Sequence, residues 1–144
     1  MDTGRAMSQE NVEIVRRFVE HWNETSEFLW ELVDRDIVYV IDPPAWLAGT
    51  YRGHAELDDL RRRTLDVYDE FRFEGDEFID NVDSVVALGA AHVRGALSGA
   101  TAAQPGAIVS RVRDGRIVAL RIYLDRDAAL EAAALRAPPL GPEA

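Results

Sequence analysis

The sequence predicts a single α+β domain built on an antiparallel sheet, and three observations support this. Apolar residues recur at helical spacing in the first half of the chain, while apolar and polar residues alternate through most of the second half. The pair Asp114-Gly115 is a strong hairpin signal between two alternating runs. Helical and β patterns that are segregated along the chain in this way are typical of α+β domains.

The first helix is expected to begin at Ser8, a residue type that caps helix N-termini well. Its apolar stripe recurs at spacings of three and four residues and comprises Val12, Val15, Val19 and Trp22. The polar residues 23–26 end this helix. The apolar spacing then predicts a short second helix at 27–33 and a third helix at 55–70.

Five strands are expected after or between these helices, at 37–42, 71–80, 84–97, 107–113 and 116–124. The first strand stops at Pro43-Pro44, because proline cannot donate a hydrogen bond to a neighbouring strand. Asp125 is expected to cap a final Ala-rich helix that ends near Leu135.

A chain of 144 residues has room for one ordinary domain, which we expect at 8–136 between an N-terminal tail, 1–7, and a C-terminal tail, 137–144. The 26 acidic and 16 basic residues give a formal net charge of -10, which argues against nucleic acid and anionic membranes as partners. No apolar run is long enough to span a membrane, and the polar start does not resemble a signal peptide.

The absence of lysine and cysteine narrows the possible chemistry. All 16 basic residues are arginine, which excludes Schiff-base and lysine-nucleophile catalysis. The lack of cysteine excludes thiol nucleophiles and thiolate metal sites, and it fits a cytoplasmic protein. The three histidines lack metal-ligand spacing and no phosphate-binding or dinucleotide motif occurs, so we expect no metal and no cofactor.

Five segments of the chain carry a family resemblance through their order and spacing: SQENVEIVRRFVEHWN, DPP, YRGHAELDDL, FEGDEFIDNVDSVV and RDGRIVALRIYLDRDAAL. Together they resemble the SnoaL-like branch of the NTF2-like, ketosteroid-isomerase-like superfamily, over about Ser8 to Leu135. The resemblance implies a cone-shaped α+β barrel, in which a curved antiparallel sheet carries three helices on its concave face around an apolar pocket. Members of the superfamily include isomerases, polyketide cyclases, epoxide hydrolases, dehydratases and ligand-binding proteins.

The resemblance also implies a homodimer that forms through the outer face of the sheet. Alternation along the first strand places Ile37, Tyr39 and Ile41 on one face. We expect this face to lie outside the core and to provide a half-apolar, self-complementary contact surface.

Asp42 is the first catalytic candidate. In a strand it shares a face with Val38 and Val40, and apolar surroundings would make its carboxylate a stronger base for abstracting a proton beside a carbonyl. The ketosteroid isomerases, a well-known case, carry an Asp-Pro general base at this place. The alternative is an aspartate that only caps the turn at the two prolines.

The oxyanion donors of the ketosteroid isomerases are missing from this sequence. Phe18 stands where their first-helix tyrosine would be, and Val109 or Ser110 stands where their second aspartate would be. A phenylalanine ring cannot donate a hydrogen bond to an enolate oxygen. Steroid isomerisation is therefore not predicted.

His92 is the second catalytic candidate, because it ends an apolar strand face where it could act as an acid, a base or a hydrogen-bond donor. The alternative is a partly exposed histidine at the solvated end of a strand. Aromatic residues with few polar groups suit a pocket for a small apolar ligand. The substrate-binding candidates are Phe18, Trp22, Trp46, Tyr51, Tyr68 and Ser110.

Two functions therefore stay open for a protein with an apolar pocket for a small organic molecule. The first is cofactor-independent proton transfer of the isomerase, cyclase or dehydratase type, with Asp42 as general base. The second is a non-catalytic ligand-binding or interaction module on the same fold. Epoxide hydrolysis would need an Asp-Arg-Asp arrangement, for which Arg94 or Arg121 could supply the arginine but no second aspartate is evident.

Overall fold

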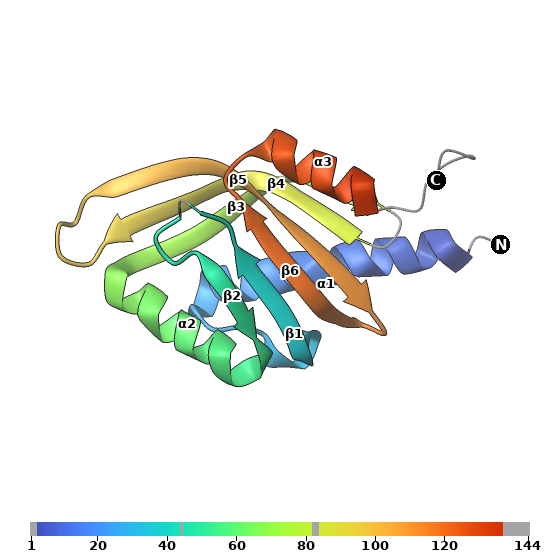
Figure 1. Cartoon of the computed structure of the whole chain (residues 1–144), viewed down its shortest axis with the longest axis horizontal. Helices are drawn as coiled ribbons and strands as arrows, with labels where there is room; N and C mark the ends of the chain where they lie inside the picture. Colours follow the sequence, from blue (N-terminus) through green and yellow to red (C-terminus); the bar gives the residue numbers. More distant parts are fainter. Residues whose placement is uncertain (1–2, 44, 82–83, 137–144) are drawn as a thin grey trace.

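The computed structural model describes residues 3–43, 45–81 and 84–136, and within these ranges it has three α-helices and one curved six-stranded sheet (Figure 1). The elements in chain order are α1 (Thr3–Thr25), the 3₁₀ turn η1 (Trp30–Leu32), β1 (Val33–Ile41), β2 (Gly49–Arg52), α2 (Gly53–Val67), β3 (Tyr68–Asn81), β4 (Ser84–Gly95), β5 (Thr101–Arg113), β6 (Arg116–Tyr123) and α3 (Arg126–Arg136). This arrangement confirms the predicted α+β class.

The strands lie in the order β2-β1-β6-β5-β4-β3, and the sheet is not closed. From β3 to β6 consecutive strands pair antiparallel, and Asp114 and Gly115 form the predicted hairpin turn, both with positive φ. β1, however, pairs with β6 in parallel, so the sheet is mixed where antiparallel pairing alone was expected. The long connection between these two strands allows the parallel pair to form.

Helices α1 and α2 cover one face of the sheet, which we call the inner face. Phe18 and Val19 of α1 and Leu60 of α2 belong to the main core, together with inner-face residues of the strands such as Ile108 and Leu120. Burial of these apolar side chains is the main favourable contribution to folding on this side of the sheet. The inner face therefore holds the larger of the two cores.

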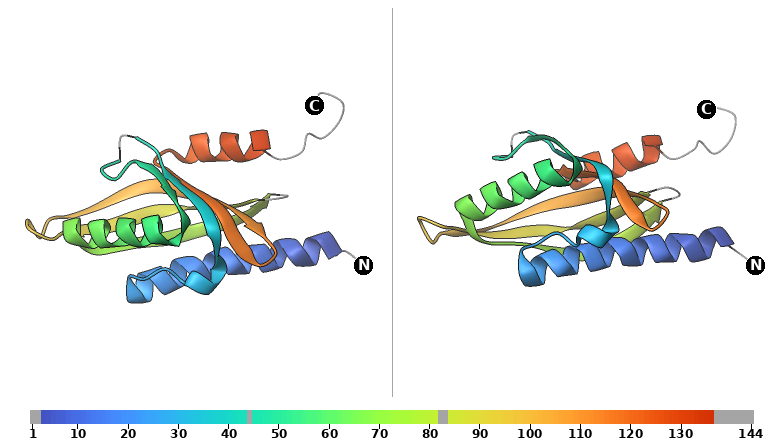
Figure 2. Two further views of the ribbon diagram at one scale, coloured as in Figure 1. Left: turned by 60° about the horizontal axis from the view of Figure 1, so that its bottom comes forward. Right: turned by 90° about the horizontal axis from the view of Figure 1, so that it is seen from below.

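Helix α3 packs against the opposite, outer face, as both views in Figure 2 show. Its Ala129 and Ala133 form a second buried cluster with Val86 of β4, Val109 of β5 and Tyr123 of β6. The expectation of three helices on the concave face is therefore corrected: two helices lie there and the third lies outside. The physical reason is that this part of the outer face is itself apolar and needs a cover.

Several predicted boundaries differ from those of the structure. Helix α1 begins at Thr3, so part of the expected N-terminal tail extends the helix, and the expected C-terminal tail lies outside the described residues. The predicted helix at 27–33 is only the turn η1, because β1 already begins at Val33 and leaves too few residues for a helix. The short strand β2 was not predicted, and β5 begins at Thr101 instead of residue 107.

Candidate ligand-binding site

A cavity of about 380 Å³ lies between the inner face of the sheet and the helices α1 and α2. Its wall is mainly aromatic and aliphatic, with Phe18 and Trp22 from α1, Phe71 and Phe73 from β3 and Ile122 from β6. None of the lining side chains in the described ranges is an aspartate, glutamate, arginine or histidine. A concave apolar site of this size is typical of small-molecule pockets.

Phe28 organises the aromatic part of the wall. Its ring centroid lies 5.8 Å from that of Phe18, 5.0 Å from that of Trp22 and 6.0 Å from that of Tyr39. Ser26 brings Phe28 to this position, because it adopts a φ of 59° where α1 ends and its amide donates to the Trp22 carbonyl. The sequence after α1 thus folds back to close the cavity floor with aromatic rings.

Three polar residues of the wall, Trp22, Asn23 and Thr64, are already hydrogen-bonded within the protein. Trp22 Nε1 donates to the Phe71 carbonyl oxygen at 2.8 Å. Asn23 pairs with the backbone of Phe73 in both directions, donating at 2.8 Å and accepting at 3.0 Å. The Thr64 hydroxyl donates to the carbonyl oxygen four residues before it in α2. These groups hold α1 to β3 and cap a helix turn, so they are not free for a ligand.

Tyr39 and Tyr123 are buried tyrosines of the wall whose hydroxyls have no hydrogen-bond partner among the described residues, and of these Tyr39 belongs to the inner-face core whereas Tyr123 packs with α3. The Tyr39 side chain is 8% exposed and lines the cavity from β1. Burial, with a smaller contribution from the neighbouring Tyr51, raises the pKa of Tyr39 above its ordinary value. The phenol therefore remains a neutral hydrogen-bond donor across the physiological pH range.

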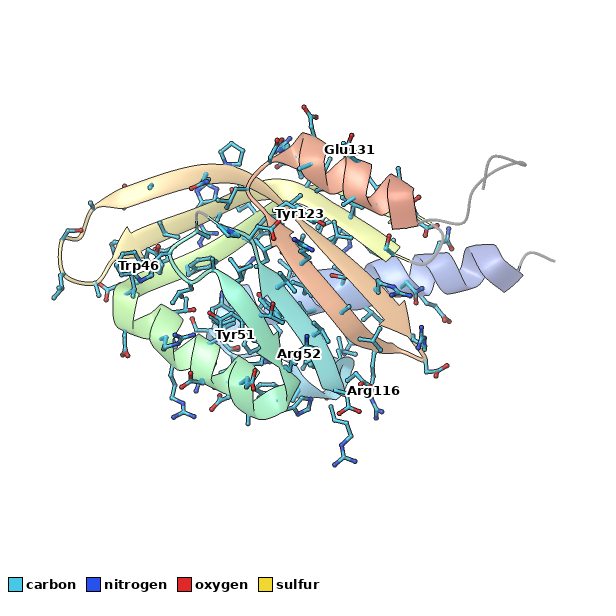
Figure 3. The ribbon with its side chains drawn as sticks, in the orientation of Figure 1. Trp46, Tyr51, Arg52, Arg116, Tyr123 and Glu131 are labelled. Atoms are coloured by element: carbon cyan, nitrogen blue, oxygen red, sulfur yellow. The ribbon has the colours of Figure 1, made fainter. Side chains whose placement is uncertain are left out.

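The cavity meets solvent near the loop between β1 and β2. Trp46 on this loop lines the cavity although it is 76% exposed, and Gln104 on β5 is also an exposed lining residue. Figure 3 labels Trp46 and, on the adjacent strand β2, Tyr51. We infer that a ligand would enter past the Trp46 ring.

Four of the six predicted binding residues line this cavity: Phe18, Trp22, Trp46 and Tyr68. Tyr51 is buried but is not among the lining residues, because its hydroxyl points to the loop, where it donates to the Leu47 carbonyl and accepts from Arg63. Ser110 is fully buried beyond the cavity. Its hydroxyl has no hydrogen-bond partner among the residues described.

Asp42 does not line the cavity. Ile41 faces the cavity, and the next residue projects to the other face, as alternation along an extended chain requires. One carboxylate oxygen of Asp42 accepts two hydrogen bonds from Arg121 of β6, at 3.0 and 2.7 Å. The carboxylate in turn raises the pKa of the Arg121 guanidinium, first through this hydrogen bond. The expected apolar wall around Asp42 is therefore replaced by an ion pair on the outer face.

His92 also stands on the outer face, because its neighbours Ala91 and Val93 in β4 line the cavity. Its Nε2 lies 2.9 Å from a carboxylate oxygen of Glu74 on the adjacent strand β3. The strands β6 and β5 separate β1 from β4 in the sheet, so Asp42 and His92 are not brought together. The two catalytic candidates do not share a site in this structure.

Tyr39 and Phe28 are the two important wall residues that the sequence analysis missed. It assigned Tyr39 to the outer face, together with Ile37 and Ile41, whereas Ile37 is fully buried and Tyr39 and Ile41 line the cavity. The composition of the strand contained a usable signal. The side chains of Ile37, Tyr39 and Ile41 are large and uncharged, which favours their burial. The opposite face carries the smaller Val38 and Val40 and ends at the charged Asp42.

Two further observations concern only the described part of the chain. No helix there is long and apolar enough to cross a membrane. No group of three or more histidine, aspartate or glutamate side chains is placed there to hold a metal ion.

Comparisons with known proteins support the fold. A family model for the SnoaL-like domain matches residues 15–120. The crystal structure of an NTF2-like protein from Burkholderia xenovorans LB400 is 30% identical, with a TM-score of 0.69, and covers 87% of this chain and 95% of its own. An NTF2-like protein of unknown function from Burkholderia pseudomallei K96243 is 25% identical, with a TM-score of 0.72, over 85% and 95% of the two chains.

A third solved structure is TerC co-crystallised with polyporic acid, at 24% identity and a TM-score of 0.72 over 87% of this chain and 98% of that one. At this level of identity the match shows a common fold only. A comparison with curated proteins gave no match.

Proposed function

The chain belongs to the SnoaL-like domain family, and on that premise we propose that it binds a small, uncharged organic molecule in the cavity on the inner face of its sheet. The single observation that carries this proposal is the absence of charged side chains from the described cavity wall. A charged ligand would lose its hydration there without gaining a counter-charge.

Binding without catalysis is the reading that fits the wall best. General acid–base catalysis requires a titratable group within hydrogen-bond reach of the reacting atom. The predicted candidates Asp42 and His92 are paired with Arg121 and Glu74 on the other face of the sheet. The groups left in the wall can orient a ligand and exclude water from it.

A matched pair of fluorescent probes tests this proposal. N-phenyl-1-naphthylamine is uncharged, and 1-anilinonaphthalene-8-sulfonate has the same rings with an added sulfonate. We expect the uncharged probe to bind with enhanced fluorescence and the sulfonate to bind at least about tenfold more weakly, because burying its charge is costly. Equal affinities, or no binding of the uncharged probe, would refute the proposal.

The cavity itself is tested by filling it. Ala91→Phe places a ring in the cavity, whereas Ala90→Phe, one residue earlier in β4, places the same ring on the other face. We expect the first variant to abolish binding of the uncharged probe and the second to retain it. Retention of binding in Ala91→Phe would locate the probe elsewhere.

Proton transfer with Asp42 as base is the second candidate function. Asp42 directly precedes the loop whose Ala45, Trp46 and Leu47 line the cavity, and this proximity favours it. Both hydrogen bonds from Arg121 are accepted by Oδ1 of Asp42, so Oδ2 is not bonded to this arginine. The base would be Oδ2, or the whole carboxylate after the ion pair with Arg121 breaks. Hydrogen–deuterium exchange of an enolisable ketone, catalysed by the protein and lost in Asp42→Asn, would support catalysis over binding alone.

We also propose that the chain forms a homodimer, now through the part of the outer face that α3 leaves uncovered. Helix α3 covers the outer face of β4 and β5, while Val38 and Val40 of β1 and Ala119 of β6 remain partly exposed. We expect a dimeric mass by light scattering at micromolar concentration and a monomeric mass for Val40→Glu, because the charge would be buried in the contact. A monomeric wild-type chain would contradict this.

A further inference from the structure

We propose that Tyr39 selects the ligand by donating a hydrogen bond to an uncharged acceptor, such as a carbonyl oxygen, on an otherwise apolar molecule. This inference rests on the proposed function, because it concerns the same cavity. The inference adds a chemical requirement for the ligand, a hydrogen-bond acceptor, and names Tyr39 as the residue that imposes this requirement.

The position of Tyr39 is the first argument. It stands on β1, with Leu120 of β6 and Tyr51 of β2 as its register neighbours, and its side chain lines the cavity on the inner face. Its ring packs edge-on to Phe28, with an interplanar angle of 70°, and belongs to the main core. Packing against Phe28 within the core restricts the orientation of the ring and so the place of its hydroxyl, which favours a specific rather than an adaptable contact.

The unused hydrogen bond is the second argument. The Tyr39 hydroxyl has no hydrogen-bond partner among the described residues, yet it is not one of their fully buried unpaired polar atoms, so it is accessible to a ligand in the cavity that its side chain lines. The cross-strand neighbour of Tyr39 is Tyr51, which is equally buried at 8% exposure. The Tyr51 hydroxyl has two partners, the Leu47 carbonyl at 2.7 Å and Arg63 at 3.0 Å. A bound acceptor would complete the hydrogen bonding of Tyr39 in the same way.

The surroundings determine which acceptor fits. The described wall has no charged side chain. A bound carboxylate or phosphate would lose its hydration shell and gain only the hydrogen bond from one phenol in return. A carbonyl oxygen needs only one or two donors when it is buried. The phenol stays protonated because burial raises its pKa, so it donates and does not act as a base at neutral pH.

The test uses two ligands that differ only at the acceptor. 1-Tetralone carries a carbonyl group where tetralin has a methylene group, and the ring system is the same. Their dissociation constants are measured by displacement of N-phenyl-1-naphthylamine from the wild-type chain and from Tyr39→Phe and Tyr51→Phe. The phenylalanine variants keep the aromatic ring and remove only the hydroxyl.

We expect Tyr39→Phe to weaken binding of 1-tetralone by about 3- to 10-fold relative to its effect on tetralin, the range for one neutral hydrogen bond. Tyr51→Phe is expected to leave the ratio of the two dissociation constants unchanged, because its hydroxyl points to the loop. An unchanged ratio in Tyr39→Phe, or a ratio changed by Tyr51→Phe alone, would overturn the inference.

Infrared spectroscopy gives an independent readout. The carbonyl stretch of bound 1-tetralone is expected at a lower frequency in the wild-type chain than in Tyr39→Phe, because the phenol hydrogen bond weakens the C=O bond. Equal frequencies would count against the inference even if the affinities differ.

The failure of this inference is distinguishable from failure of the proposed function. If the uncharged probe and tetralin bind but Tyr39→Phe does not discriminate, the cavity binds ligands and Tyr39 is not the selecting donor. If the uncharged probe does not bind the wild-type chain, the proposed function is wrong, and the role of Tyr39 is refuted with it.

Discussion

Removing one hydroxyl from each of two facing tyrosines is expected to change stability in opposite directions. Tyr39 and Tyr51 are opposite each other in the β1–β2 ladder and are equally buried, so their substitution by phenylalanine removes the same atom from similar depth. The hydroxyls differ in their partners. This pair therefore isolates the contribution of hydrogen bonding from that of burial.

The magnitudes follow from the contacts. Tyr51→Phe loses a bond to the Leu47 carbonyl and a bond from Arg63, which is itself about half exposed. We expect a loss of about 1 kcal/mol in the free energy of unfolding, because the exposed arginine contributes little and the partly buried Leu47 carbonyl loses its partner. Tyr39→Phe loses no hydrogen bond to a described residue and removes a buried polar group, so we expect a change between zero and a gain of about 1 kcal/mol.

Urea denaturation followed by circular dichroism provides the assay, with both variants measured against the wild-type chain without ligand. Equal m-values would show that the variants unfold from a similarly compact state. The reasoning would be refuted if Tyr39→Phe were destabilised as much as Tyr51→Phe. That outcome would mean that the Tyr39 hydroxyl has a stabilising partner in the free protein.

Three further predictions concern pH, the cavity mouth and the close approach of two strands. Because folding raises the pKa of Tyr39, the folded state favours its neutral form, so wild-type stability is expected to fall relative to Tyr39→Phe above about pH 10, by up to about 1.4 kcal/mol per pH unit. Urea titrations of both proteins at pH 8 and pH 11 measure this, and a constant difference would contradict it. Trp46 is expected to shift its fluorescence emission to shorter wavelength when tetralin binds, because its exposed ring becomes covered; the shift should vanish in Trp46→Phe. Gly89→Ala is expected to destabilise the fold by several kcal/mol, because its Cβ would overlap the Glu74 carbonyl oxygen, whereas Ala at Gly99, where φ is positive but space is open, should cost only about 1 kcal/mol. Comparable urea midpoints for the two alanine variants would argue against this close approach.

Gly89 lies where the backbones of β3 and β4 approach each other closely. It pairs with Gly75 across β4 and β3, next to a register shift in that ladder, and the absence of side chains lets the backbones approach.

The local patterns of the sequence predicted most of the architecture. The stripe from Val12 to Trp22 identified α1, and the Asp114-Gly115 pair identified the β5–β6 hairpin, because both signals depend on residues close together in the chain. The missed elements depend on distant contacts. Strand β2 has four residues and exists because β1 supplies its hydrogen bonds, and no local pattern specifies that pairing.

The family resemblance was also accessible from the sequence, since it depends on the order of segments, and the family match over residues 15–120 confirms it. The binding candidates came instead from the distribution of aromatic residues along the chain, and their role in binding stays a prediction. Phe18, Trp22, Trp46 and Tyr68 were predicted as binding residues, and all four line the cavity. Aromatic character alone was not a sufficient signal, because Tyr51 is aromatic and buried but does not line the cavity.

The sequence by itself determined which residues of each strand share a face, and only the tertiary structure decided which face became the cavity wall. Alternation grouped Tyr39 with Ile37 and Ile41, and Asp42 with Val38 and Val40, and both groupings hold. Both faces of this sheet are partly apolar, because α1 and α2 cover one and α3 covers part of the other. Alternation alone does not say which of two partly apolar faces is covered, and on β1 the packing of α1 and α2 placed Tyr39 inside while Val38 and Val40 stayed partly exposed.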